Sequence, residues 1–117
     1  MSRVSTKKPV SDPAEPLTPE QVWGRLLAWQ ARREHSRAEL ADKLSGLDVP
    51  SGIAEAALDR LVELGLQNDD RYAEMLVRSQ LQRGKGRQAI RQALQQRGLD
   101  RDHPALAEQA ADLDWVA

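Results

Sequence analysis

The sequence predicts an all-α protein made of tandem three-helix repeats that form an elongated, curved helical array. Three observations lead to this prediction. Apolar residues recur at helical spacing through most of the chain, and no segment alternates with the two-residue period of a strand. Capping signals and Gly or Pro breaks divide the chain into six segments. The pattern then repeats after 50 residues, which is typical of duplicated units that share a core.

The composition bounds the class of protein. The chain has 117 residues, of which 40% are hydrophobic, 30% are charged and only 3% are aromatic. It is too short for separate cofactor and substrate domains. It has no Cys, which excludes disulfides, thiolate metal sites and thiol nucleophiles and is typical of a reducing compartment. No secretory signal and no long apolar run occurs, so we expect a soluble, cytoplasmic protein without membrane contact.

We expect a disordered leader over residues 1–17, a first three-helix repeat over residues 18–66 and a second over residues 67–117. The leader has three prolines among Ser and Lys residues and no apolar period. A third repeat on the same spacing would place its first apolar position near residue 122, after the last residue, Ala117. Two repeats without a third are therefore predicted.

Capping signals mark the helices of the first repeat. Thr18 and Gln21 form a capping box that begins a helix running to about residue 33, and Ser36 and Glu39 form a second box that begins a short helix. A third helix begins after residue 50 and ends at Gly65, which suits a left-handed cap. The positions expected on the apolar faces of these helices are Val22, Trp23, Leu26, Leu27, Trp29 or Gln30, Leu40, Leu44, Ile53, Ala57, Leu58, Leu61 and Leu64.

The second repeat follows the same plan. Asn68 or Asp69 can cap a fourth helix over about residues 70–83, and a fifth helix over about residues 87–97 ends at Gly98. A sixth helix is expected to start near residue 102 or 103, with a proline in its first turn. The expected apolar positions are Tyr72, Leu76, Leu81, Ile90, Leu94, Leu106, Ala110 and Leu113.

A shift of 50 residues places like residues over one another. Apolar residues match apolar residues, and arginines match arginines at the turn between the first two helices of each unit. The coincident arginines make a chance match between amphipathic helices less plausible. The matched residues are Val22 and Tyr72, Leu26 and Leu76, Arg33 and Arg83, Arg37 and Arg87, Leu40 and Ile90, and Leu44 and Leu94.

Basic residues concentrate in residues 78–97, which hold six Lys and Arg but no Asp or Glu, in a chain of net charge -1. They surround the Gly84-Lys85-Gly86 turn between two predicted helices. Such a cluster favours an acidic protein groove or a phosphate backbone, although a solvated helix face has the same composition. The candidate partner-binding residues are Arg33, Arg37, Arg78, Arg83, Lys85, Arg87 and Arg91.

No catalytic, metal-binding or nucleotide-binding pattern is found. His35 and His103 are far apart, and His35 is expected to interact with carbonyl groups at a helix end rather than act as a base. The glycine-rich turn lacks the full phosphate-loop motif. One of Trp23 and Trp29 is expected in the core, and the other is either half-buried or a partner anchor. We therefore predict a protein that is not an enzyme and takes no cofactor or small-molecule substrate.

Two DNA-binding alternatives stay open at this point. Electrostatic binding of single-stranded DNA is compatible with the basic segment, although residues 78–97 offer no aromatic side chain for base stacking. Alternatively, residues 87–97 could serve as the recognition helix of a helix-turn-helix regulator. The residues that would read base edges are Gln88, Arg91, Gln92, Gln95 and Gln96.

The chain resembles the RecX family of regulatory proteins over about residues 22–113. Several segments occur in the order and spacing of the family, so the resemblance does not depend on any one of them. These segments are Ala31-Arg-Arg-Glu-His-Ser-Arg-Ala-Glu-Leu40, Leu58-Asp-Arg-Leu-Val-Glu-Leu-Gly-Leu66, Asn68-Asp-Asp-Arg-Tyr-Ala-Glu74 and residues 78–98.

The resemblance implies an array of three-helix repeats that lies in the groove of the RecA filament on single-stranded DNA. It also implies inhibition of the ATPase, strand-exchange and co-protease activities of RecA, and so modulation of DNA repair and the SOS response. The corner motif of the family falls on residues 33–37 and again on residues 83–87. Family members generally continue into a third repeat, from which this sequence departs by ending at Ala117.

Overall fold

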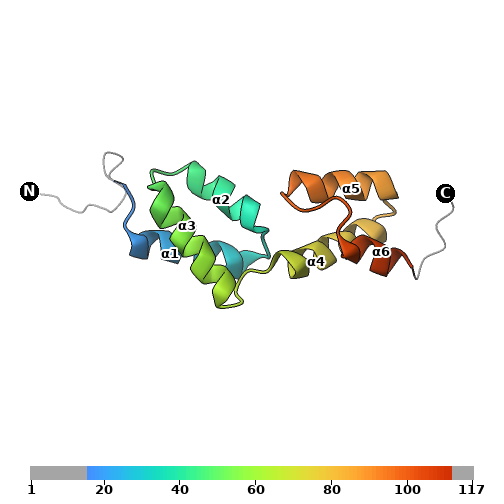
Figure 1. Cartoon of the computed structure of the whole chain (residues 1–117), viewed down its shortest axis with the longest axis horizontal. Coiled ribbons are helices and arrows are strands. Elements are labelled where there is room, and N and C mark those ends of the chain that lie inside the picture. Colours follow the sequence, from blue (N-terminus) through green and yellow to red (C-terminus); the bar gives the residue numbers. More distant parts are fainter. Residues whose placement is uncertain (1–15, 112–117) are drawn as a thin grey trace, which may run out of the picture.

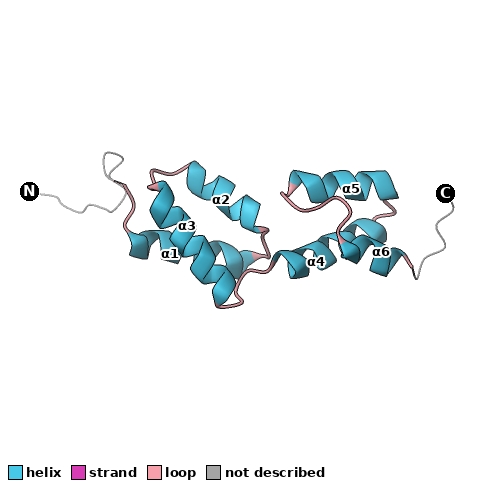
Figure 2. Ribbon diagram, in the orientation of Figure 1, coloured by secondary structure: helices cyan, strands magenta, loops and turns pink. Residues whose placement is uncertain are grey.

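A computed structural model describes residues 16–111, which fold into six α-helices without a strand (Figures 1 and 2). This confirms the all-helical prediction. The described part is elongated, with extents of 69 × 26 × 19 Å. None of its helices is long and apolar enough to cross a membrane. The helices are α1 (Pro19–Arg32), α2 (Arg37–Ser45), α3 (Ser51–Glu63), α4 (Asp69–Gln82), α5 (Arg87–Gln96) and α6 (Pro104–Ala110).

Helices α1, α2 and α4 begin at the capping residues that the sequence indicated. Thr18 and Ser36 each form a complete capping box, with Gln21 and Glu39 respectively as the partner. The Asn68 side chain accepts a hydrogen bond from the backbone N–H of the third residue of α4, which satisfies a donor that the helix itself leaves unpaired. Both capping boxes and the Asn68 cap are therefore confirmed.

Left-handed glycines end three of the helices. Gly65, Gly84 and Gly98 have φ values of 73°, 76° and 77°. After each of them the chain closes with the paired backbone bonds of a Schellman motif, as in the bonds from Gly84 N–H to Leu81 O and from Lys85 N–H to Gln80 O. These motifs fix the direction in which each following segment leaves its helix.

Two apolar clusters hold the helices together, one from α1–α3 and one from α4–α6. All four apolar pairs that match after the 50-residue shift are buried in them, so the pairing of core positions is confirmed. The exact boundaries of the two repeats stay a prediction. The first cluster contains Val22, Leu26, Leu40, Leu44, Leu58 and Leu61, and the second contains Tyr72, Ala73, Leu76, Val77, Ile90, Leu94, Leu99, Ala105 and Leu106.

Several apolar residues lie further out than the helical pattern predicted. Leu27 is 38% exposed, and Leu64 is 57% exposed because it lies just after the last residue of α3. Leu81 is only partly buried. Leu17, which the sequence assigned to the leader, instead packs against the first cluster and donates its N–H to Asp48 O. The predicted Leu113 and leader residues 1–15 lie outside the described residues.

The expectation that one tryptophan enters the core is wrong. Trp23 and Trp29 are both half-buried at the edge of the first cluster. The Arg60 guanidinium lies 4.2 Å from the ring centroid of Trp23, and Lys43 Nζ lies 5.3 Å from that of Trp29. Each ring therefore packs against the first cluster and also lies under a cation, which stabilises a partly exposed position.

Candidate functional site

The candidate residues lie mainly at two turns that the repeat relates to each other. We call residues 33–37, between α1 and α2, the first corner, and residues 83–87, between α4 and α5, the second corner. Both have an arginine at each end. Their side chains, however, are placed very differently.

The second corner projects into solvent. Arg83 lies at the C-terminal cap of α4, Lys85 follows the left-handed Gly84, and Arg87 is the first residue of α5. All three basic side chains are exposed. Because residues 82–89 are all exposed, the corner presents its charge at the surface. Arg78 on α4 is exposed as well.

Arg91 differs from the other candidates of the second repeat. Its Nε donates to Asp102 Oδ1 at 3.0 Å, and one of its terminal nitrogens donates to Gln88 Oε1 at 2.7 Å. Only 25% of the Arg91 side chain is exposed. The basic segment, which contains no acid of its own, is therefore partly neutralised by an aspartate that follows it in the chain.

The two arginines of the first corner form ion pairs with acidic residues. Arg33 donates to Glu34 O at 2.8 Å and lies 3.4 Å from the Glu39 carboxylate. Arg37 reaches across to α3, where its terminal nitrogen lies 3.0 Å from Glu55 and 2.8 Å from Asp59. Both arginines are thus already paired within the repeat, which the sequence did not reveal.

His35 lies buried at the centre of the first corner, with 2% of its surface exposed. Its Nδ1 lies 2.9 Å from Arg33 O, and its backbone N–H donates to Gln30 Oε1 at 2.9 Å. Burial, and then the positive charge of Arg33, lower the pKa of His35 below 6.5. The contact with a carbonyl confirms the prediction for this residue.

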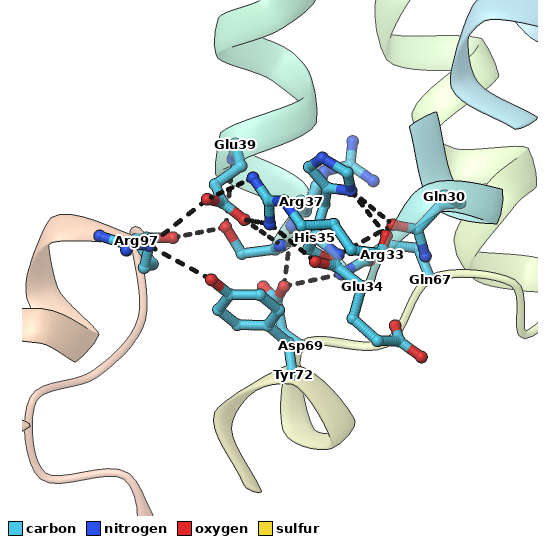
Figure 3. A network of polar contacts seen from close by, with 11 residues as sticks. Gln30, Arg33, Glu34, His35, Arg37, Glu39, Gln67, Asp69, Tyr72 and Arg97 are labelled. Atoms are coloured by element: carbon cyan, nitrogen blue, oxygen red, sulfur yellow. Dashed lines mark hydrogen bonds and ion pairs between the residues drawn. The ribbon is translucent and has the colours of Figure 1, made fainter. Parts of the chain in front are cut away.

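The first corner also contacts the second repeat (Figure 3). Ser36 Oγ donates to Arg97 O at 2.8 Å, and Arg97 Nε lies 3.4 Å from Glu39 and 3.2 Å from Tyr72 Oη. Arg37 N–H donates to Asp69 Oδ1 at 2.9 Å. The partners are 25 to 61 residues apart, so no local sequence signal identifies this network.

The helix-turn-helix alternative depends on the outer face of α5. Its glutamines are exposed, whereas Arg91 is held by the ion pair described above. Among residues 16–111, no three acidic or histidine side chains come close enough together to hold a metal ion. The exposed glutamines are Gln88, Gln92, Gln95 and Gln96.

Comparison with known proteins identifies the family. A model described as the first three-helix domain of RecX matches residues 31–61, and one described as the second three-helix domain matches residues 68–107. The regulatory protein RecX of Pseudomonas entomophila is 41% identical over 86% of this chain and 64% of its own length. That of Pseudomonas fluorescens Pf-5 is 46% identical over 73% of this chain and 55% of its own length. The chain therefore spans about 55–64% of these relatives.

Solved structures agree with this assignment. A crystal structure of RecX from Lactobacillus salivarius superposes with a TM-score of 0.70 and 26% identity, covering 80% of this chain and 60% of that one. Another crystal structure of a regulatory protein RecX, with 24% identity, has a TM-score of 0.71 over 82% of this chain and 48% of that one, which shows the same fold. The chain therefore belongs to the RecX family of regulatory proteins.

Proposed function

We propose that this chain binds the RecA filament on single-stranded DNA in the cytoplasm and inhibits its ATPase, strand-exchange and co-protease activities. In that role it acts without catalysis and modulates DNA repair and the SOS response. Two findings support the proposal. The chain belongs to a family whose members are named regulatory proteins, and its elongated shape suits a groove.

The observation that carries the proposal is the exposed second corner. Arg83 and Lys85 project from the turn between α4 and α5. Residues 75–99, which surround this turn in the sequence, contain no acidic residue. Long-range attraction would draw this surface toward an acidic groove or toward phosphate groups. Arg78 and Arg87 extend the same basic surface on either side. Arg33, Arg37 and Arg91 have acidic partners, so we place them after Arg83 and Lys85 among the binding candidates.

ATP hydrolysis by RecA on single-stranded DNA tests the proposal directly. We expect the protein to inhibit hydrolysis at concentrations below those at which it coats the bare DNA. The double variant Arg83→Glu/Arg87→Glu should inhibit less, because it reverses the charge of the second corner. The double variant Arg25→Glu/Arg32→Glu is the matched control, since it changes the net charge equally at exposed positions of α1.

Two outcomes would contradict the proposal, and one would contradict the role of the second corner. Inhibition that appears only when the protein coats the DNA would favour direct DNA binding instead. Equal losses in the two double variants would mean that net charge matters and the second corner does not. No inhibition at saturating protein would mean that this chain lacks the activity.

A further inference from the structure

The N-terminus of α2 meets the C-terminus of α5 end to end across the two repeats (Figure 1). We call this contact the junction. It has a polar half and a close-packed half. The junction residues are Ser36, Ala38 and Glu39 from the first repeat and Tyr72, Arg97 and Gly98 from the second.

The polar half depends on a serine with two roles. Ser36 is fully buried, and its Oγ accepts a hydrogen bond from Glu39 N–H while donating to Arg97 O. One hydroxyl thus caps α2 and satisfies a carbonyl at the end of α5. The end-to-end arrangement also brings the positive end of the α2 dipole to the negative end of the α5 dipole, which is favourable.

Side chains enclose this contact. Glu39 lies 3.4 Å from Arg97 Nε and also accepts from Ser36 N–H at 3.0 Å. Burial opposes ionisation of Glu39, but the Ser36 N–H and the Arg33 guanidinium outweigh it and lower the pKa of Glu39 below 4.5. The carboxylate therefore stays charged near neutral pH and holds Arg97 against the first repeat.

The close-packed half lies at Gly98. A Cβ atom placed on Gly98 would lie 2.5 Å from the Cβ of Ala38. No real pair of such atoms approaches so closely, so any side chain at this position has to push the α5–α6 turn away from α2. The backbone of one repeat therefore rests directly on a helix of the other.

We infer that the junction locks the two repeats at one relative orientation and thereby positions the second corner for the partner. This inference rests on the proposed function, because it assigns the junction residues a positioning role in filament binding. A flexible link would have to lose its freedom on binding, whereas a locked pair presents both repeats in one arrangement from the start.

A side chain introduced at Gly98 tests whether the junction fixes the relative orientation of the two repeats. The variant Gly98→Ala should open the junction, whereas Gly84→Ala introduces the same left-handed strain at φ 76° with nothing within 4 Å. Cysteines introduced at the exposed Ala28 and Gln92 carry spin labels, since the chain has no cysteine of its own. Pulsed electron paramagnetic resonance should give one narrow distance for the unaltered labelled protein and for Gly84→Ala, and a shifted or broadened one for Gly98→Ala.

A rescue variant separates the effect of the side-chain clash at Gly98 from the effect of left-handed backbone strain. Ala38→Gly removes the Cβ atom with which the new Cβ of Gly98→Ala would clash. The double variant should therefore recover the narrow distance between the two spin labels, although the left-handed backbone strain at residue 98 remains. As a second route that keeps Gly98, Arg97→Met removes the contacts with Glu39 and Tyr72 and should broaden the distance. Arg101→Met makes the same charge change at an exposed residue of the next turn and should not.

Inhibition of RecA by Gly98→Ala, by the Gly98→Ala/Ala38→Gly double variant and by Arg97→Met tests the positioning role, whereas Gly84→Ala serves as a control for the distances alone because Gly84 belongs to the second corner. Gly98→Ala should raise the half-inhibitory concentration about tenfold, equivalent to about 1.4 kcal/mol of binding free energy, and the rescue variant should restore it. Unchanged distances in both Gly98→Ala and Arg97→Met would overturn the lock, and altered distances with unchanged inhibition would overturn the positioning role. If the unaltered protein does not inhibit RecA, the proposed function fails, while the distances still decide whether the lock exists.

Discussion

The two corners have matching places in the repeat but different surroundings. In the first, both arginines have acidic partners, His35 is buried and Ser36 bonds to the other repeat. In the second, glycines replace Glu34 and Ser36 at the matching positions, and the basic residues are exposed. A basic residue at a repeated position is therefore not a binding residue by its position alone. The residues that surround it in the folded protein decide whether its charge forms ion pairs within the fold or is exposed to a partner.

Arg37 makes this difference concrete. Its acidic partners Glu55 and Asp59 lie one helical turn apart on α3. Fifty residues later, the matching positions on α6 carry Ala105 and Gln109. The second repeat therefore does not carry this acidic pair at the matching positions. One repeat uses the corner for internal structure, and the other keeps it at the surface.

The largest expected effect compares the two cores. Leu40→Ala and Leu94→Ala should each lower the free energy of unfolding by about 2–5 kcal/mol, because both side chains are fully buried and leave a cavity. Denaturant unfolding followed by circular dichroism measures both. A loss at only one of the two positions would show that the cores are not equivalent, and no loss at either would contradict the assigned burial.

Ser36→Ala should have the next largest effect. It removes the cap of α2, for which about 0.5–2 kcal/mol is typical, together with the bond to Arg97 O. Ser45→Ala is the control, because Ser45 is exposed and bonds only to its own helix at Asp42 O. Equal losses of unfolding free energy in the two variants would mean that Ser36 contributes nothing beyond an ordinary helix-end serine.

A smaller, pH-dependent effect is expected at His35. Its pKa is lowered in the folded protein, so the unfolded chain binds a proton more readily. Its contribution to stability is therefore present above the ordinary value of 6.5 and is lost as the pH falls from there through the lowered pKa. Comparing unfolding at about pH 7.5 and about pH 5.5 should show a smaller pH difference for His35→Gln than for the unaltered protein. An identical difference would exclude His35 as the cause.

The smallest expected effect sharpens the contrast between the corners. Gly86 caps α5 without a side-chain hydrogen bond, at φ -82° and ψ 172°, close to the -75° and 158° of Ser36. No atom within 4 Å would obstruct a side chain there. Gly86→Ser should therefore raise stability by a few tenths of a kcal/mol, roughly the difference between these residues at an N-cap, while Gly86→Ala should not. A lower melting temperature for Gly86→Ser than for Gly86→Ala would contradict this.

The sequence by itself determined the helices and the repeated core. Capping boxes, left-handed glycines and apolar spacing act between residues a few positions apart, so Thr18, Ser36 and Gly65 could be assigned without a structure. The 50-residue shift then identified matching buried residues, such as Leu26 and Leu76, because both repeats place the same helix faces on their cores.

Only the tertiary structure decided which arginines keep their charge at the surface. Arg37 is paired from 18 and 22 residues away, Arg91 from 11, and Arg97 is held by residues of both repeats. Such pairings depend on how whole helices pack, which a count of charges along the chain does not contain. The packing of whole helices also places both tryptophans at the edge of the core. It likewise creates the junction at Gly98, which no local sequence pattern indicates. Interactions between residues close in sequence determine where the helices begin and end, and packing between helices far apart in sequence determines which side chains are buried, paired or exposed.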